Sequence, residues 1–104
     1  MAKINEKKYE AVILYLTQKL GGKIKGKKKL AKLLYFVDFD FFEKYEKPFT
    51  GDTYKALPMG PYPLHMEKIV KNLVQEKKLE IKSVEEWKNY NATEVYKEIG
   101  RAHV

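Results

Sequence analysis

The chain has 104 residues, and its 44% of apolar residues are enough for a single hydrophobic core. It contains no cysteine, which excludes a disulfide framework, a thiolate metal site and a cysteine nucleophile. No apolar stretch approaches the roughly 20 residues of a membrane-spanning helix, and the N-terminus lacks the apolar run of a signal peptide. These features predict a cytoplasmic protein that does not contact membranes.

The formal net charge of +7 is concentrated in the N-terminal third of the chain. Residues 1–32 hold ten lysines and two glutamates, whereas residues 33–104 are close to neutral. Half of those lysines lie within one short stretch, at Lys23, Lys25, Lys27, Lys28 and Lys29. Such a cluster attracts nucleic-acid phosphate or an acidic protein surface, or it only keeps a solvated loop soluble. Charge alone does not distinguish these possibilities.

Two helices are predicted in the first half of the chain. Apolar residues recur at helical spacing over residues 5–20, and two glycines then end the helix. The same periodicity returns over residues 27–45, before Pro48 stops the second helix. The other faces of this second helix are also apolar, with Tyr35, Phe36, Phe39 and Phe42. We therefore expect neighbouring elements to cover the helix on more than one side.

The middle of the chain is predicted to be irregular. Residues 50–52 indicate a tight turn, residues 53–57 a short extended stretch, and residues 58–61 a rigid loop. A third helix is expected to begin at residues 61–63, because proline is tolerated in a first helical turn, and to end near Lys78. Its polar face is available to a partner through His65, Lys68, Lys71, Asn72 and Gln75.

A β-hairpin is predicted near the C-terminus. Residues 79–83 alternate in polarity, and residues 92–97 can return against them after a loop at residues 89–91. Residues 100–104 suggest no further element, and we expect a disordered or vector-derived tail. The predicted fold is therefore α+β and mainly α: one domain over residues 1–99, with a three-helix core and a small β-hairpin in winged-helix order.

The sequence offers little catalytic chemistry. Its one serine is Ser83 and its histidines are His65 and His103, so a nucleophile beside a base has almost no support. Asp38 and Asp40 point in different directions on one helix and cannot share a metal ion. The glycines fit no nucleotide-binding motif. We therefore expect no enzyme activity, no cofactor and no metal site.

Three side chains in the middle of the chain are of particular interest. Asp38 stands among aromatic neighbours, where a carboxylate is costly unless it is hydrogen-bonded. It either caps a neighbouring helix or loop or contacts a partner. Tyr54 and Tyr62 flank the proline-rich loop, and we expect both at the surface, because tyrosine is a good interface anchor.

Several motifs follow one another in the chain. They are Lys32-Leu33-Leu34-Tyr35-Phe36-Val37-Asp38, then Phe49-Thr50-Gly51-Asp52, then Tyr54, Ala56 and the Gly60-Pro61 pair. In this order they resemble the Panacea antitoxin domain, also called the SocA-like family, over about residues 4–82. The positions that match the family motif are Tyr35, Asp38, Thr50, Gly51, Asp52, Tyr54, Gly60 and Pro61.

The resemblance implies an intracellular bacterial or phage-borne protein whose relatives neutralise cognate toxins by direct binding. Domains of the family usually continue with further helical sequence, so we expect this one to be truncated at its C-terminus. The roles of most motif residues are expected to be architectural. Gly51 and Gly60 allow tight turns, Asp52 caps a backbone group, and Pro61 starts a helix.

Two functions remain open. In the first, the domain is an antitoxin-like module that binds a protein, most plausibly a toxin, through Tyr35, Asp38, Tyr54, Tyr62, His65 and Lys68. In the second, it is a winged-helix nucleic-acid-binding protein of phage or prophage origin that uses Lys23, Lys25, Lys27, Lys28, Lys29, Lys68, Lys71 and Asn72. The first is favoured, because base readout commonly uses arginine and the chain has only Arg101. Weak non-specific nucleic-acid binding is compatible with both.

Overall fold

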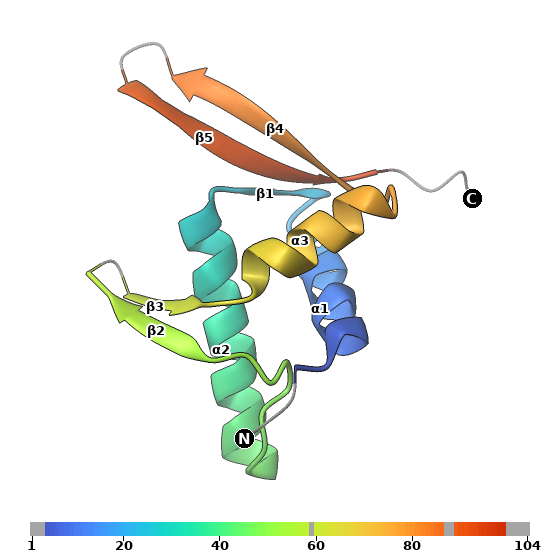
Figure 1. The fold of residues 1–104 in the computed structure, drawn as a ribbon, viewed down its shortest axis with the longest axis vertical. Coiled ribbons are helices and arrows are strands. Elements are labelled where there is room, and N and C mark those ends of the chain that lie inside the picture. Colours follow the sequence, from blue (N-terminus) through green and yellow to red (C-terminus); the bar gives the residue numbers. More distant parts are fainter. Residues whose placement is uncertain (1–3, 59, 87–88, 100–104) are drawn as a thin grey trace.

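The structure is a computed structural model that describes residues 4–58, 60–86 and 89–99 (Figure 1). The fold is α+β, with three helices and two small antiparallel sheets, as the sequence predicts. The elements follow one another as α1 (Glu6–Lys19), β1 (Lys23–Lys25), α2 (Lys27–Tyr45), β2 (Tyr54–Leu57), β3 (Gly60–Pro63), α3 (Met66–Gln75), β4 (Leu79–Glu86) and β5 (Asn89–Glu98).

The first helix has the limits that the sequence predicts. Asn5 caps it, because its side-chain oxygen accepts a hydrogen bond from the backbone N–H of Lys8 at 3.1 Å. The buried side of α1 packs on the other two helices and on β1. The core they share consists of Tyr9, Ile13, Ile24, Leu30, Leu34, Met66, Ile69, Leu73, Leu79 and Tyr96.

The second helix also has its predicted limits, but the prediction that it is covered on several sides is wrong. Its buried residues are Leu30, Ala31, Leu34 and Asp38, which form one stripe. In Figure 1 the C-terminal half of α2 extends past the other two helices, so no helix covers its outer side. The exposed fractions there are large: 60% for Phe36, 48% for Phe39, 54% for Phe42 and 58% for Tyr45.

A three-stranded sheet has the order β1-β5-β4, with both pairs antiparallel. Strand β1 occupies part of the stretch that the sequence analysis treated as a possible basic loop. Ile24 explains the difference, because it is buried between the exposed Lys23 and Lys25 and pairs with Tyr96. With β1 in place, α1, β1, α2, α3, β4 and β5 follow the winged-helix order, and the β2–β3 hairpin is an insertion between the second and third helices.

The predicted C-terminal hairpin is present, but its strands are longer than expected. Residues 89–91, predicted as the loop, begin β5 instead, and the register pairs Glu86 with Asn89. The hairpin extends away from the helices in Figure 1. A strand alternates clearly between apolar and polar residues only where one of its faces packs on a core, so the ends of these strands are hard to predict from sequence. The expected tail, residues 100–104, lies outside the described residues.

Residues 60–63 form strand β3, so the prediction that Pro61 begins the third helix is wrong. The N–H of Leu64 donates to Thr53 across the hairpin at 3.0 Å. Successive backbone nitrogens of a strand point to its two edges in turn. Because the nitrogen of Leu64 points to β2, those of Pro61 and Pro63 point to the opposite edge of β3, where no N–H donor is needed. Gly60, with a φ of +121°, allows the turn that reverses the chain.

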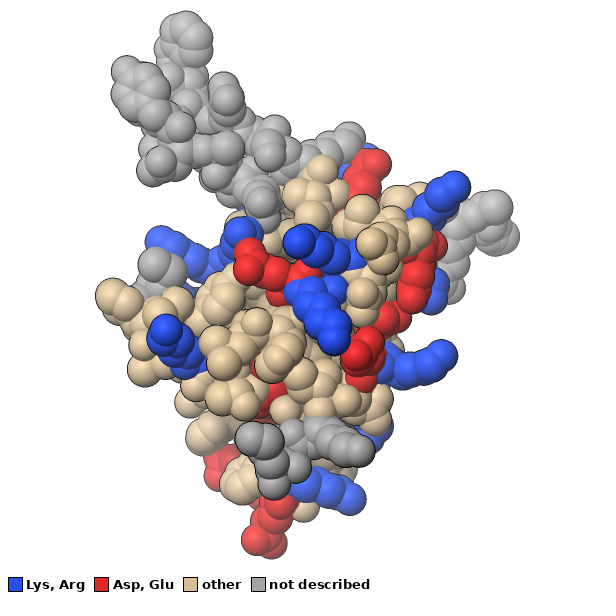
Figure 2. Space-filling view, in the orientation of Figure 1, with Lys and Arg blue, Asp and Glu red and all other residues tan. Residues whose placement is uncertain are grey.

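The third helix is therefore shorter than predicted, ending at Gln75. Its polar side is partly engaged with α1. Lys68 and Asn72 both reach the carboxylate of Glu6, at 3.4 Å and 3.3 Å. Figure 2 shows lysines and acidic residues side by side over this face of the molecule rather than a continuous basic surface. No helix in the described part of the chain is long and apolar enough to cross a membrane.

Because β1 is held through a single buried side chain, Ile24→Ala is expected to lower the free energy of unfolding by about 2–5 kcal/mol. The matched substitution Lys23→Ala, at an exposed position of the same strand, is expected to change it by less than about 0.5 kcal/mol. Urea unfolding followed by circular dichroism measures both values. Equal effects of the two substitutions would show that β1 is not part of the core.

Candidate functional site

Asp38 is the first of two buried carboxylates near the exposed half of α2. Its side chain faces the segment that follows the helix, and only 8% of the residue is exposed. The carboxylate accepts hydrogen bonds from the backbone N–H groups of Phe49 at 3.1 Å and Thr50 at 2.8 Å. It also accepts from the hydroxyls of Thr50 and Tyr54, both at 2.6 Å. The prediction that Asp38 caps a loop is confirmed.

Asp52 is the second carboxylate, and its side chain is completely buried. It accepts hydrogen bonds from the hydroxyl of Tyr9 on α1 at 2.6 Å and from the backbone N–H of Thr53 at 2.7 Å. The backbone N–H of His65 donates to it at 2.9 Å, and the Nδ1 atom of the same residue lies 2.8 Å from it. Asp52 therefore connects α1 to the beginning of α3, as a backbone cap of the kind predicted.

Thr50 joins the two carboxylates. Its hydroxyl donates to Asp38 and accepts from the backbone N–H of Asp52 at 3.1 Å, while its carbonyl accepts from the N–H of Asn5 at 3.0 Å. The chain can turn between these contacts because Gly51 has a φ of +79°, a conformation that side chains disfavour. We call Tyr9, Asp38, Thr50, Asp52, Tyr54 and His65 the carboxylate network.

The donors in this network are neutral hydroxyl and amide groups, apart from the ring of His65. Burial, followed by the hydrogen bond to Asp52, raises the pKa of Tyr9. Burial and the hydrogen bond to Asp38 raise the pKa of Tyr54 in the same way. Both hydroxyls therefore remain protonated donors across the physiological range. Hydroxyl and amide donors thus occupy the acceptor sites of each carboxylate without bringing a positive charge, apart from the ring of His65 beside Asp52.

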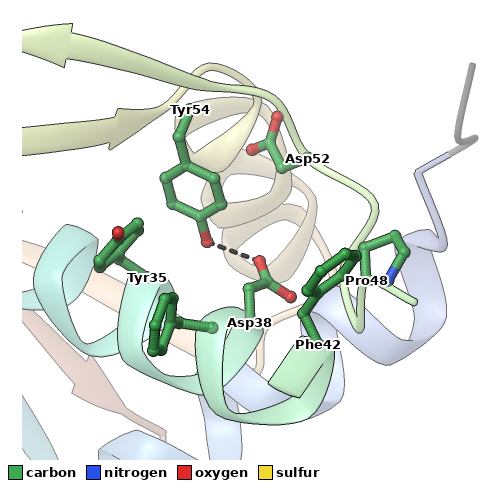
Figure 3. A pocket seen from close by; sticks show the side chains of 7 residues that line it. Tyr35, Asp38, Phe42, Pro48, Asp52 and Tyr54 are labelled. Atoms are coloured by element: carbon green, nitrogen blue, oxygen red, sulfur yellow. Dashed lines mark hydrogen bonds between the residues drawn. The ribbon is translucent and has the colours of Figure 1, made fainter. Parts of the chain in front are cut away.

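A pocket of about 200 Å³ opens beside Asp38 (Figure 3). Tyr35, Phe39 and Phe42 reach it together, because residues spaced four and then three apart share one face of a helix. Tyr54 approaches from β2, with its ring edge-on to Tyr35 at a centroid distance of 5.5 Å. The complete lining is Tyr35, Asp38, Phe39, Phe42, Pro48, Asp52 and Tyr54.

The pocket continues into an exposed apolar surface. We call Phe36, Phe39, Phe42 and Tyr45 the aromatic face of α2; they follow one another at intervals of three residues in a row that winds around the helix, and each has about half or more of its area exposed. Single exposed apolar residues are ordinary, but a cluster of large aromatic side chains on so small a domain is typical of an interaction surface.

The sequence from residue 30 to residue 103 matches the family described as Antitoxin SocA-like, Panacea domain. The chain belongs to this family. The resemblance noted in the sequence is thereby confirmed, and its motif residues include most of the carboxylate network. No curated protein and no solved structure gave a significant match.

In this Panacea domain the predicted partner-binding residues do not form one site. Tyr35, Asp38 and Tyr54 meet at the pocket. His65 does not line the pocket but contacts Asp52, which does. Tyr62 instead packs against the core, and Lys68 pairs with Glu6, so these two are separate from the pocket. Tyr54 and Tyr62 are both half-buried, so the expectation that they lie at the surface is met only in part: Tyr54 stands beside the pocket and Tyr62 against the core.

Four residues of the site were not predicted from the sequence. Phe39 and Phe42 were expected to be covered and Pro48 only to end the helix, yet all three line the pocket. Tyr9 was predicted only as an apolar residue of the first helix. It is buried in the core, and its hydroxyl also donates a hydrogen bond to Asp52. The one available signal was the shared helical face of Tyr35, Phe39 and Phe42.

The candidate nucleic-acid residues of the Panacea domain differ in their surroundings. Lys27 pairs with Glu67 at 2.7 Å, and Lys68 and Asn72 are engaged with Glu6. The exposed positions are Lys23, Lys25, Lys28, Lys29 and Lys71. Among the described residues, no three His, Asp or Glu side chains are placed to hold a metal ion.

Removing the Asp38 carboxylate leaves two backbone N–H groups and two hydroxyls without their acceptor. We expect Asp38→Ala to lower the free energy of unfolding by about 3 kcal/mol, the upper end of the usual penalty for orphaned buried polar groups. Asp40→Ala, on the exposed side of the same helix, is the control and should cost less than about 0.5 kcal/mol. If chemical denaturation finds the two variants equally stable, the network does not support the fold.

The raised pKa of Tyr54 makes a pH-dependent contribution to stability. An unfolded tyrosine ionises near pH 10, whereas the folded residue stays protonated at higher pH, so this stability is present below about pH 10 and is lost above it. The loss is about 1.4 kcal/mol per pH unit for each such tyrosine. Tyr54→Phe should therefore make the decline of unfolding free energy above pH 10 shallower by that amount, measured by urea denaturation at several alkaline pH values. An unchanged slope contradicts the assignment.

Proposed function

We propose that this Panacea domain is an antitoxin that neutralises its toxin by direct contact, without catalysis, through the aromatic face of α2 and the adjoining pocket. Family membership supports the general role. The observation that carries the choice of surface is the exposure of four aromatic side chains on the half of α2 that no other helix covers. Aromatic residues of this kind dominate the energetics of protein interfaces.

The rigidity of the surface also favours a binding role. Asp38 anchors α2 to the loop that follows it, and Phe42 lies one turn further along the same side of the helix, so the aromatic residues beside the pocket are held on a fixed support. A surface that is ordered before binding loses less conformational entropy when the partner arrives. The hydrogen bonds of the network also offset the cost of burying the carboxylates of Asp38 and Asp52, so their burial does not require a catalytic role.

The winged-helix element order supports nucleic-acid binding as a second candidate function. In that reading α3 enters a groove and the exposed lysines of β1 and α2 contact phosphates. However, Lys68 and Asn72 on α3 already contact the carboxylate of Glu6. They would have to give up these contacts to bind DNA, which makes α3 less suited to reading bases. This candidate predicts steep salt dependence, because release of counterions from several phosphates lowers affinity by about 10³–10⁵ between 50 and 200 mM salt.

The test uses the protein encoded beside this chain as the candidate toxin. We expect co-expression of the domain to restore growth, and Phe39→Ala combined with Phe42→Ala to abolish the rescue. In purified components the double variant should weaken the complex by at least about 30-fold, corresponding to the 2 kcal/mol or more of an interface hot spot. Isothermal titration calorimetry measures this loss.

Two control variants separate the candidate functions. Tyr15→Ala removes an equally exposed aromatic residue from α1 and should leave the complex intact. Replacing Lys23, Lys28 and Lys29 by glutamine should abolish weak binding to random duplex DNA without affecting growth rescue. If the lysine variant loses rescue while the double phenylalanine variant keeps it, the aromatic face is not the toxin-binding surface.

A further inference from the structure

We propose that the pocket beside Asp38 binds the guanidinium group of an arginine side chain presented by the protein partner. This inference rests on the proposed function and names the part of the toxin that the site would recognise. The pocket, at about 200 Å³, is smaller than the roughly 300–1,000 Å³ of sites for drug-sized ligands. It therefore suits the end of one side chain better than a metabolite.

The walls of the pocket are aromatic. Tyr35, Phe39 and Phe42 rise from α2 and Tyr54 faces them from β2 (Figure 3). The negative electrostatic potential over an aromatic ring attracts a cation placed within about 6 Å of its centre, and the attraction is larger where water is excluded. Four such rings around one small space make the pocket favourable for a cation and for the methylene groups that carry it.

The pocket also has a negative charge beneath it. Asp38 and Asp52 both contribute to its lining. The donors to Asp38 are hydroxyl and amide groups, which do not cancel its charge, whereas the His65 ring lies 2.8 Å from Asp52. Residues 35–52 hold five carboxylates and two lysines, a formal net charge of −3 in a chain whose total is +7. Screening limits charge interactions to about 8–10 Å at ordinary ionic strength, so the carboxylate of Asp38, which lines the pocket, acts directly on a group inside it. A cation is the complementary partner.

The hydrogen bonds of the two carboxylates favour guanidinium over ammonium. Each carboxylate already accepts four short contacts, so an entering cation finds few free acceptors. An ammonium group is strongly hydrated and needs such acceptors when it leaves water. A guanidinium group is more weakly hydrated and stacks on aromatic faces, so it loses less on entering this site.

The position of the pocket fits an interface. It adjoins the aromatic face of α2, so a protein that covers Phe39 and Phe42 also covers the pocket entrance. Arginine is among the residues enriched at interface hot spots, and such anchors are most effective when surrounding contacts exclude water.

The experiment titrates the isolated domain with ethylguanidinium chloride while NMR follows the ring resonances of the pocket residues. N-ethylurea is the neutral probe of matched shape, and ethylammonium chloride is the alternative cation, all at constant ionic strength. We expect saturable shifts with ethylguanidinium at millimolar concentration and binding at least about tenfold weaker for the other two. Equal binding of N-ethylurea would mean a merely apolar pocket, and equal binding of ethylammonium would remove the assignment to arginine. Absence of any saturable shift would overturn the proposal.

A pair of variants localises the effect. Phe42→Leu keeps an apolar side chain but removes the ring, and it should weaken ethylguanidinium binding several-fold. Tyr15→Leu makes a comparable change on α1, away from the pocket, and should have no effect. Equal effects of the two variants would contradict binding in the pocket.

The titration contains no toxin, so its outcome is independent of the proposed function. If ethylguanidinium binds as expected but the domain does not bind the toxin, the proposed function alone fails. If the domain binds the toxin through its aromatic face but ethylguanidinium does not bind, the arginine proposal alone fails.

Discussion

The architecture of this Panacea domain depends on two buried carboxylates whose hydrogen-bond donors, apart from the ring of His65, are hydroxyl and backbone amide groups. Burying a charge is expensive, and the expense is offset only when its acceptor sites are filled by well-placed donors. The donors for Asp38 and Asp52 come from α1, the segment after α2, β2 and the start of α3. Meeting the needs of these two groups therefore helps to fix the relative positions of α1, β2, the start of α3 and the segment after α2. This also explains why the loop that contains Thr50 and Gly51 is ordered without regular secondary structure.

The network adjoins a surface of different character. Beside the fully paired Asp38 on α2, Phe39 and Phe42 line the same pocket and leave about half of their area exposed. Exposed aromatic residues on a mobile helix would favour non-specific association, whereas residues held at fixed spacing present one particular shape. Under the proposed function the carboxylate network contributes to specificity in two ways: it holds these aromatic residues in place, and Asp38 and Tyr54 line the pocket itself. Its charge also extends into the pocket, where it would select among the partner's side chains.

The sequence predicted the limits of α1 and α2, the C-terminal hairpin and the capping role of Asp38, because these follow from local periodicity and from the cost of an isolated carboxylate. It did not identify the donors to Asp38, since Thr50 and Tyr54 lie 12 and 16 residues away and the fold alone brings them near. Strand β1 was missed because three residues carry too little alternation. The exposure of Phe39 and Phe42 was not predictable, because apolar helical residues are usually buried and nothing in the sequence marks a face that lacks a covering element.

The connection between the second and third helices explains how a winged-helix order can serve protein recognition. In a helix-turn-helix the two helices are joined by a turn of about 3–4 residues, which places the second helix close to the first and leaves it free to enter a groove. Here the connection spans residues 46–65 and contains β2 and β3. It supplies Pro48, Asp52 and Tyr54 to the pocket, and Asp52 holds the beginning of α3. The insertion thus creates the site and anchors the helix that would otherwise read bases. Since function belongs to sites rather than to folds, this inserted segment is a better guide to the domain's partner than the winged-helix order around it.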